Sequence, residues 1–225
     1  MMLMLAIEQE YDELDMAIRY FQNTIMRVRY SGIPVAVAPH GLTLGGGCEM
    51  TMHSDVAVAA AETYIGLVEV GAGLIPAGGG TKELALRASD KYFKGDIEIP
   101  TLQEMSLNIA MAKVATSARE AFDLGILRKG IDIEVMNSNR VIAEAKNAVL
   151  ELANNGYTPP QQRSDIKVLG RSALGSFYTG IASMRMGNYI SAHDEMIAKK
   201  VCYVICGGDL SAPTEVNEQY LLDLE

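Results

Sequence analysis

The feature that most constrains this sequence is a glycine-rich segment, residues 45–80, which carries nine glycines. Three consecutive glycines at 45–47 follow a short apolar run and precede residues that favour helix. A second cluster at 71–80 follows another apolar stretch. Glycine permits positive φ angles and close approach of the backbone to another group. We therefore expect tight turns here, with the backbone packed close to another group.

Neither glycine cluster forms a nucleotide-binding motif. A phosphate loop needs Lys and then Ser or Thr directly after its last glycine, whereas Gly80 is followed by Thr81 and then Lys82. The stretch GAGLIP has Pro76 where a dinucleotide fingerprint needs its third glycine. The glycines therefore point to a different use of the backbone.

Length and charge exclude several classes of protein. A chain of 225 residues with 49% hydrophobic residues is long enough to bury a substantial core in one large domain. The net charge of −9 speaks against binding to nucleic acid, which requires a basic face. Three cysteines are an odd number, which speaks against a disulfide framework and favours a reducing, cytoplasmic location. The N-terminal apolar run is too short for a signal peptide or a membrane span.

Hydrophobic periodicity and turn residues predict an α/β chain. Apolar residues at spacings of three and four predict helices, and β-branched runs between glycines and prolines predict buried strands. A capping box, Ser117 with Glu120, is expected to open one helix, and the segment Ser191-Ala192-His193-Asp194 is expected to open another. We expect helices at 12–30, 118–124, 141–152 and 191–205, strands at 33–38, 56–60 and 131–135, and an extended linker after residue 156.

Two carboxylates are the candidate acid–base groups. Glu49 lies one turn inside the helix that the first glycine turn opens, where an acid also complements the helix dipole. Glu69 follows 20 residues later, between Val68 and Val70, where burial of a carboxylate is costly unless it is partnered or functional. Two such acids beside unpaired N–H groups are what addition of water to a double bond requires.

The remaining chemistry-bearing residues favour structural roles. Cys202 and Cys206, four apart on an expected helix, are interpreted as core residues because no matching His or Asp accompanies them. The three histidines are too dispersed for a metal triad, and His53 is interpreted as a helix-surface partner of Glu49. We expect no metal site.

The segment GLTLGGGCEMTMHSD, followed by YIGLVEVGAGLIPAGGGTKEL and TSAREAFDLGILRKG, resembles the crotonase (enoyl-CoA hydratase/isomerase) family over about residues 33–152. Ala77 departs from the glycine usual in that family. The resemblance implies a crotonase-like α/β fold, a spiral of ββα units. It also implies that the Gly46 N–H binds the thioester oxygen, and that Glu49 and Glu69 hold and activate water. It further implies that acyl-CoA is bound by Leu44, Gly45, Leu74 and Pro76.

The C-terminal stretch, residues 157–225, resembles part of the bacterial multifunctional 3-hydroxyacyl-CoA dehydrogenase/enoyl-CoA hydratase proteins of fatty-acid β-oxidation. We therefore expect a partial crotonase-like domain at 1–156, truncated before Met1 so that the second oxyanion N–H is absent, and a helical extension at 157–225. The expected partners are an acyl-CoA thioester and an upstream dehydrogenase domain, with a homo-oligomer as one expected assembly. No cofactor is expected here, and NAD is expected only in the dehydrogenase domain.

The resemblance predicts reversible syn-hydration of a trans-2-enoyl-CoA. One alternative is a Δ3-Δ2 enoyl-CoA isomerase, which shuttles one proton and needs one carboxylate, so the presence of both acids favours hydration. Another alternative is a catalytically incomplete CoA-binding or assembly module of a larger oxidoreductase.

Overall fold

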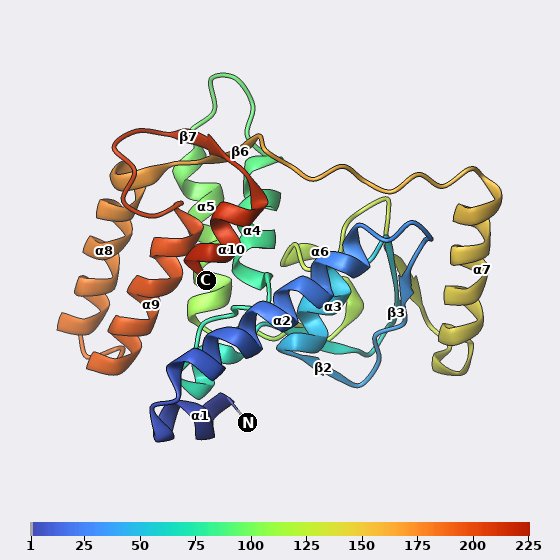
Figure 1. Ribbon diagram of the computed structural model, residues 1–225, viewed down its shortest axis with the longest axis horizontal. Coiled ribbons are helices and arrows are strands. Elements are labelled where there is room, and N and C mark those ends of the chain that lie inside the picture. Colours follow the sequence, from blue (N-terminus) through green and yellow to red (C-terminus); the bar gives the residue numbers. More distant parts are fainter. Residues whose placement is uncertain (1) are drawn as a thin grey trace.

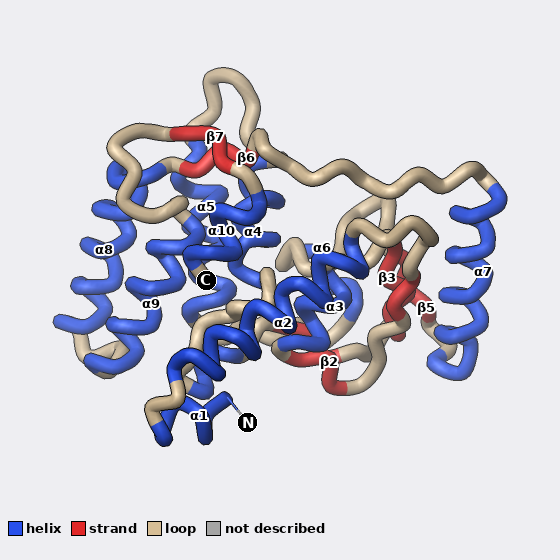
Figure 2. Tube along the Cα trace, viewed as in Figure 1, coloured by secondary structure: helices blue, strands red, loops and turns tan. Residues whose placement is uncertain are grey.

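The computed structural model describes residues 2–225. Helices form most of the regular structure, and the strands are short (Figures 1 and 2). The helices are α1 Met2–Glu8, α2 Tyr11–Arg29, α3 Gly46–Met52, α4 Gly80–Ser89, α5 Glu98–Ala110, α6 Ala118–Asp123, α7 Val141–Asn154, α8 Gly170–Met186, α9 Ala192–Ile205 and α10 Glu218–Leu224, with 3₁₀ helices η1 Glu69–Ala72 and η2 Ser138–Arg140. The strands are β1 Ala36–Val37, β2 Leu42–Leu44, β3 Val56–Ala60, β4 Tyr64–Gly66, β5 Ile133–Val135, β6 Ile166–Val168 and β7 Thr214–Val216. In this part of the chain, no helix has both the length and the apolar character needed to cross a membrane.

Strand β3 is the centre of a three-stranded parallel sheet with the order β1-β3-β5. All five of its residues are buried, as expected for a parallel strand covered on both faces. Val56 and Val58 pack with Ala145 of α7 in a small core on one face. Ala57 and Ala59 belong to the main core on the other face. Because successive side chains of β3 point to opposite faces, the strand packs against α7 with one face and against the main core with the other.

A second parallel pair, β2 and β4, positions the glycine-rich segment. The register pairs Leu44 with Gly66, so both strands end at the same edge. The Gly45 N–H continues this pairing by donating to the Gly66 carbonyl at 2.9 Å. Helix α3 starts two residues after the end of β2, and η1 starts three residues after the end of β4. The segments that carry Glu49 and Glu69 therefore leave the sheet side by side.

The C-terminal part packs on α4 and α5 in the main core. An extended segment leads from α7 across the molecule to β6, which pairs with β7 in an antiparallel sheet (Figure 1). The extension is largely helical, as expected, and it also contains this two-stranded sheet. The sheet forms because the chain returns past β6 after α9 and pairs with it, a long-range event that helical periodicity does not report. Cys202 and Cys206 lie in the core, as interpreted from the sequence.

Most expected elements are present within a few residues of their expected bounds. The helix expected at 12–30 is α2, the strand at 56–60 is β3, and the helix at 191–205 is α9. Ser191 and Asp194 form the complete capping box. At α6, Ser117 accepts from the Glu120 N–H, but the Glu120 carboxylate instead bonds Thr116. Helices α1, α4, α5 and α8 were not among the elements expected from the sequence.

The interpretation of His53 as a surface residue is wrong, because the His53 side chain is fully buried. Its Nδ1 lies 2.7 Å from the Glu49 carbonyl, and its Nε2 lies 2.9 Å from the ammonium of Lys82. Burial and the Lys82 charge hold the pKa of His53 well below its ordinary value. Lys82 also pairs with Glu218 of α10 at 2.8 Å. A buried cluster of His53, Lys82 and Glu218 therefore connects α3, α4 and α10 next to the second glycine cluster, residues 71–80.

Candidate active site

Glu49 is held by the backbone of the second glycine cluster. Its side chain extends from the middle of α3, and the residue is 2% exposed. Its Oε1 accepts hydrogen bonds from the N–H groups of Gly78 at 2.8 Å and Gly80 at 2.9 Å. Among the described residues, no group donates a hydrogen bond to the other oxygen, Oε2. One carboxylate oxygen is thus anchored while the other remains available for chemistry.

The pKa of Glu49 is raised to about 7, mainly by burial and then by the charge of Glu69. The hydrogen bonds from Gly80 and Gly78 act in the opposite direction, because they stabilise the ionised form. A carboxyl group whose pKa lies near neutrality exchanges a proton readily in either direction. This is the property that an acid–base group requires.

Glu69 starts η1 and faces the same space. Burial raises its pKa above the ordinary value. Its Oε2 is buried, and no described residue hydrogen-bonds to it. Leaving such an oxygen unpaired costs free energy. Gly45, in the left-handed region with φ of 56°, makes room for this carboxylate, since a Cβ there would lie 3.0 Å from Glu69 Oε1.

The two carboxylates line one largely apolar cavity of about 420 Å³. This volume is in the range of small-molecule sites. The residues that line it come from α2, α3, η1, the second glycine cluster (residues 71–80, the glycine loop) and Glu225, which follows α10. The lining residues are Leu14, Ile18, Phe21, Gly46, Glu49, Glu69, Leu74, Ile75, Ala77, Gly78 and Glu225.

Gly46 opens α3 at the floor of this cavity. The N–H groups in the first turn of a helix have no acceptor within the helix and carry partial positive charge. The ring of Phe21 covers this position closely, because a Cβ on Gly46 would lie 3.0 Å from its Cζ atom. The geometry therefore brings an N–H donor, two carboxylates and an apolar wall together.

The other predicted binding residues divide into two groups. Leu74 lines the cavity. Leu44, Gly45 and Pro76 are not among the lining residues: Leu44 ends β2, and Gly45 precedes α3 beside Glu69. The Pro76 carbonyl accepts a hydrogen bond from the Thr81 hydroxyl at 2.9 Å. These three positions shape the backbone around the site.

Several cavity residues were not predicted as site residues. Leu14, Ile18 and Phe21 were recognised only as the apolar face of a helix, and this pattern does not distinguish a cavity wall from a core. Glu225 carried no signal, because an acid in an acidic tail has no local feature that indicates burial. Gly78 lay in the recognised glycine cluster, but its contact with Glu49 is long-range.

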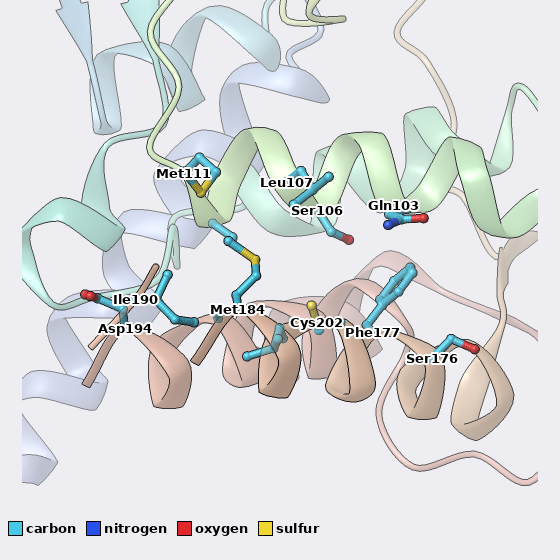
Figure 3. Close-up of a pocket in the computed structure, with 14 residues that line it drawn as sticks. Gln103, Ser106, Leu107, Met111, Ser176, Phe177, Met184, Ile190, Asp194 and Cys202 are labelled. Atoms are coloured by element: carbon cyan, nitrogen blue, oxygen red, sulfur yellow. The ribbon is translucent and has the colours of Figure 1, made fainter. Parts of the chain in front are cut away.

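A second cavity of about 320 Å³ lies between α5, α8 and α9 (Figure 3). Leu107 and Met111 face Phe177 and Met184 across it. Neither Glu49 nor Glu69 lines this cavity. Within residues 2–225, no cluster of three or more His, Cys, Asp or Glu side chains forms a metal-binding arrangement.

Comparison with known proteins identifies the fold first. The structure matches the crystal structure of an enoyl-CoA hydratase/isomerase from Cupriavidus metallidurans CH34 with a TM-score of 0.52 and 16% identity, covering 88% of this chain and 63% of that one. The chain therefore has a crotonase-like fold. Residues 5–94 match the sequence model of the enoyl-CoA hydratase/isomerase family. The segment that carries Glu49 and Glu69 is therefore similar to this family.

Two curated relatives extend the comparison. The chain is 41% identical over all 225 residues to the "Probable 3-hydroxyacyl-CoA dehydrogenase" of Bacillus subtilis (strain 168), and it spans 28% of that protein's length. It is 30% identical over 122 residues to the "Short-chain-enoyl-CoA hydratase" of Clostridium acetobutylicum, covering 52% of this chain and 42% of that relative.

Proposed function

We propose that this chain carries an enoyl-CoA hydratase site that adds water to a trans-2-enoyl-CoA thioester. The observation that carries the proposal is the pair formed by the buried Glu49 and the partly buried Glu69, with raised pKa values in one largely apolar cavity. The match of residues 5–94 to the enoyl-CoA hydratase/isomerase family supports the same reaction.

In the proposed reaction, the Gly46 N–H polarises the thioester carbonyl oxygen. One glutamate removes a proton from water, whose oxygen forms a bond to Cβ of the enoyl group as the Cα–Cβ double bond is broken. The other glutamate, protonated, delivers its proton to Cα. Both groups act from the same side of the cavity, which gives syn addition and a 3-hydroxyacyl-CoA. Because only protons and water are transferred, no residue is assigned to a metal or redox cofactor.

We further propose that the product passes to a 3-hydroxyacyl-CoA dehydrogenase partner, which would require NAD outside the residues described here. The match of the whole chain to a stretch of a protein named as such a dehydrogenase supports this proposal. Oxidation of the 3-hydroxy group is the reaction that such an enzyme performs on the product of hydration.

The test is turnover of crotonyl-CoA, measured as loss of the absorbance of the conjugated enoyl thioester. A matched assay with a trans-3-enoyl-CoA, which gains that absorbance on isomerisation, tests the isomerase alternative. Hydration with little isomerisation is expected. Binding of the thioester by calorimetry without either turnover would instead favour a CoA-binding or assembly module and would contradict the proposal.

A further inference from the structure

Glu225 lies at the end of the chain sequence but within the wall of the cavity. Its Oε2 accepts a hydrogen bond from the Gly79 N–H at 2.7 Å, and its Oε1 accepts one from the Lys82 N–H at 2.7 Å. Both donors belong to the start of α4. The same short segment therefore meets two carboxylates that come from elements far apart in the sequence.

The hydrogen bonds of the two carboxylates alternate along the backbone. The Gly78 and Gly80 N–H groups donate to Glu49, and the intervening Gly79 N–H donates to Glu225. Gly79 is in the left-handed region with φ of 101°. This conformation turns successive N–H groups toward different partners. A shift of the Gly79 peptide would therefore also move the two donors that orient Glu49.

A second contact fixes the same loop to α10. The side-chain amide of Gln22, a buried residue of α2, donates to the Ala77 carbonyl at 2.9 Å and to the Leu222 carbonyl at 3.1 Å. Ala77 directly precedes Gly78. The last helix is thus bound to the glycine loop on both sides of the Glu49 anchor.

From this arrangement we infer that Glu225 is a positioning residue for Glu49. By holding the Gly79 and Lys82 N–H groups, it fixes the turn whose Gly78 and Gly80 N–H groups anchor one oxygen of Glu49 and leave the other oxygen for the reaction. This inference rests on the proposed hydratase function for its kinetic consequence, but the backbone coupling is independent of that function.

The pKa of Glu225 is raised, because its carboxyl group is buried near that of Glu49 at the start of α4. Burial, and then the charge of Glu49, raise the pKa of Glu225 to about 8, while the N–H groups of Lys82 and Gly79 act in the opposite direction. Hydrogen bonds from the helix start compensate part of the cost of burying two acids close together.

The kinetic test compares Glu225→Ala and Glu225→Gln with the wild type in crotonyl-CoA hydration. A misplaced catalytic group lowers turnover more than binding, so kcat of Glu225→Ala is expected to fall ~10- to 100-fold with KM nearly unchanged. Glu225→Gln keeps one acceptor oxygen and the side-chain volume, so its kcat is expected to lie between the two. Asp223→Asn is the matched control, because Asp223 lies on the same helix, is exposed, and pairs with Arg19 instead of α4. Wild-type kcat in folded Glu225→Ala would overturn the inference.

Amide hydrogen exchange provides a readout that does not depend on activity. Loss of Glu225 is expected to raise exchange at Gly79 and Lys82 and also at Gly78 and Gly80, whose acceptor is Glu49. Faster exchange only at Gly79 and Lys82 would show a local role and would overturn the coupling. If the wild type does not hydrate crotonyl-CoA, the proposed function fails, whereas the exchange pattern still decides whether Glu225 positions Glu49. If Glu225→Ala does not fold, the same two measurements on Glu225→Gln decide the question.

Discussion

Glu49 Oε1 accepts a hydrogen bond from the Gly78 N–H at 2.8 Å, and Gly78 also lies directly beneath the ring of Phe21. A Cβ on Gly78 would lie 2.4 Å from Glu49 Oε2 and 2.2 Å from Phe21 Cε1. Both distances are far inside van der Waals contact. Only glycine at this position lets the loop anchor the carboxylate and support the aromatic wall at once.

Gly78→Ala should therefore lower hydratase turnover by ~10²-fold, because the added methyl group displaces Glu49 from its working position. The control is Gly71→Ala, where an added Cβ meets nothing within 4 Å. Steady-state kinetics on both variants check the prediction. Adding Phe21→Ala relieves the contact with the ring but not that with Glu49, so activity should remain low. Full recovery in the double variant would show that the ring, and not the carboxylate, is the sensitive partner.

The role of the Gly46 N–H is tested by comparing two substitutions at this position. Gly46→Pro removes the N–H, and proline is well tolerated at the first position of a helix. Loss of one oxyanion donor should lower kcat by roughly 10²–10³-fold. Gly46→Ala keeps the N–H while adding the same Cβ beside Phe21, so it reports the steric part alone. Equal activity of the two variants, with thermal stability unchanged, would remove the N–H from the mechanism.

Replacing either catalytic candidate by its amide should separate turnover from substrate binding. Glu49→Gln and Glu69→Gln should each lower crotonyl-CoA hydration by ~10²–10⁴-fold, because each carboxylate transfers one proton, whereas thioester binding should be largely retained. Calorimetry and turnover measure the two quantities. Glu151→Gln, on the exposed face of α7, is the control. If one of the two variants keeps near-wild-type hydration, that residue is not an acid–base group.

Glu49 also predicts a pH dependence of stability. Its pKa is about 7 in the folded protein and 4.5 when unperturbed, so the folded state binds this proton more tightly. Its stabilising contribution is complete below pH 4.5 and is lost as the pH rises through about 7. This shift corresponds to about 3 kcal/mol in the free energy of unfolding.

The measurement is urea unfolding of the wild type and Glu49→Gln at pH 5 and pH 8. Because the amide does not titrate, the variant should lose less of its free energy of unfolding between these two conditions than the wild type does. Groups that do not interact with Glu49 contribute equally to both proteins and cancel, whereas the pKa shift of Glu225, which the charge of Glu49 increases, is smaller in the variant and acts in the same direction. The same loss in both proteins would show that the pKa of Glu49 is not raised on folding.

The sequence alone determined several local elements of the structure, one of them at the candidate active site. Three consecutive glycines before helix-forming residues predicted the turn that opens α3, because few other residues adopt the required backbone angles. The continuous apolar run of β3 predicted a strand covered on both faces. Ser191 and Asp194 predicted the start of α9, since a capping box depends only on residues within one turn.

Only the tertiary structure decided which distant groups meet at the site. The sequence pattern indicates only that Phe21 belongs to an apolar helix face, whereas in the structure its ring covers Gly46 and Gly78. His53 reads as a surface residue, yet it is buried against Lys82. Glu225 belongs to an acidic tail, yet its carboxylate holds the backbone beside Glu49. Periodicity and capping report interactions within a few residues, whereas these contacts depend on the packing of α2, α4 and α10, which no local pattern encodes.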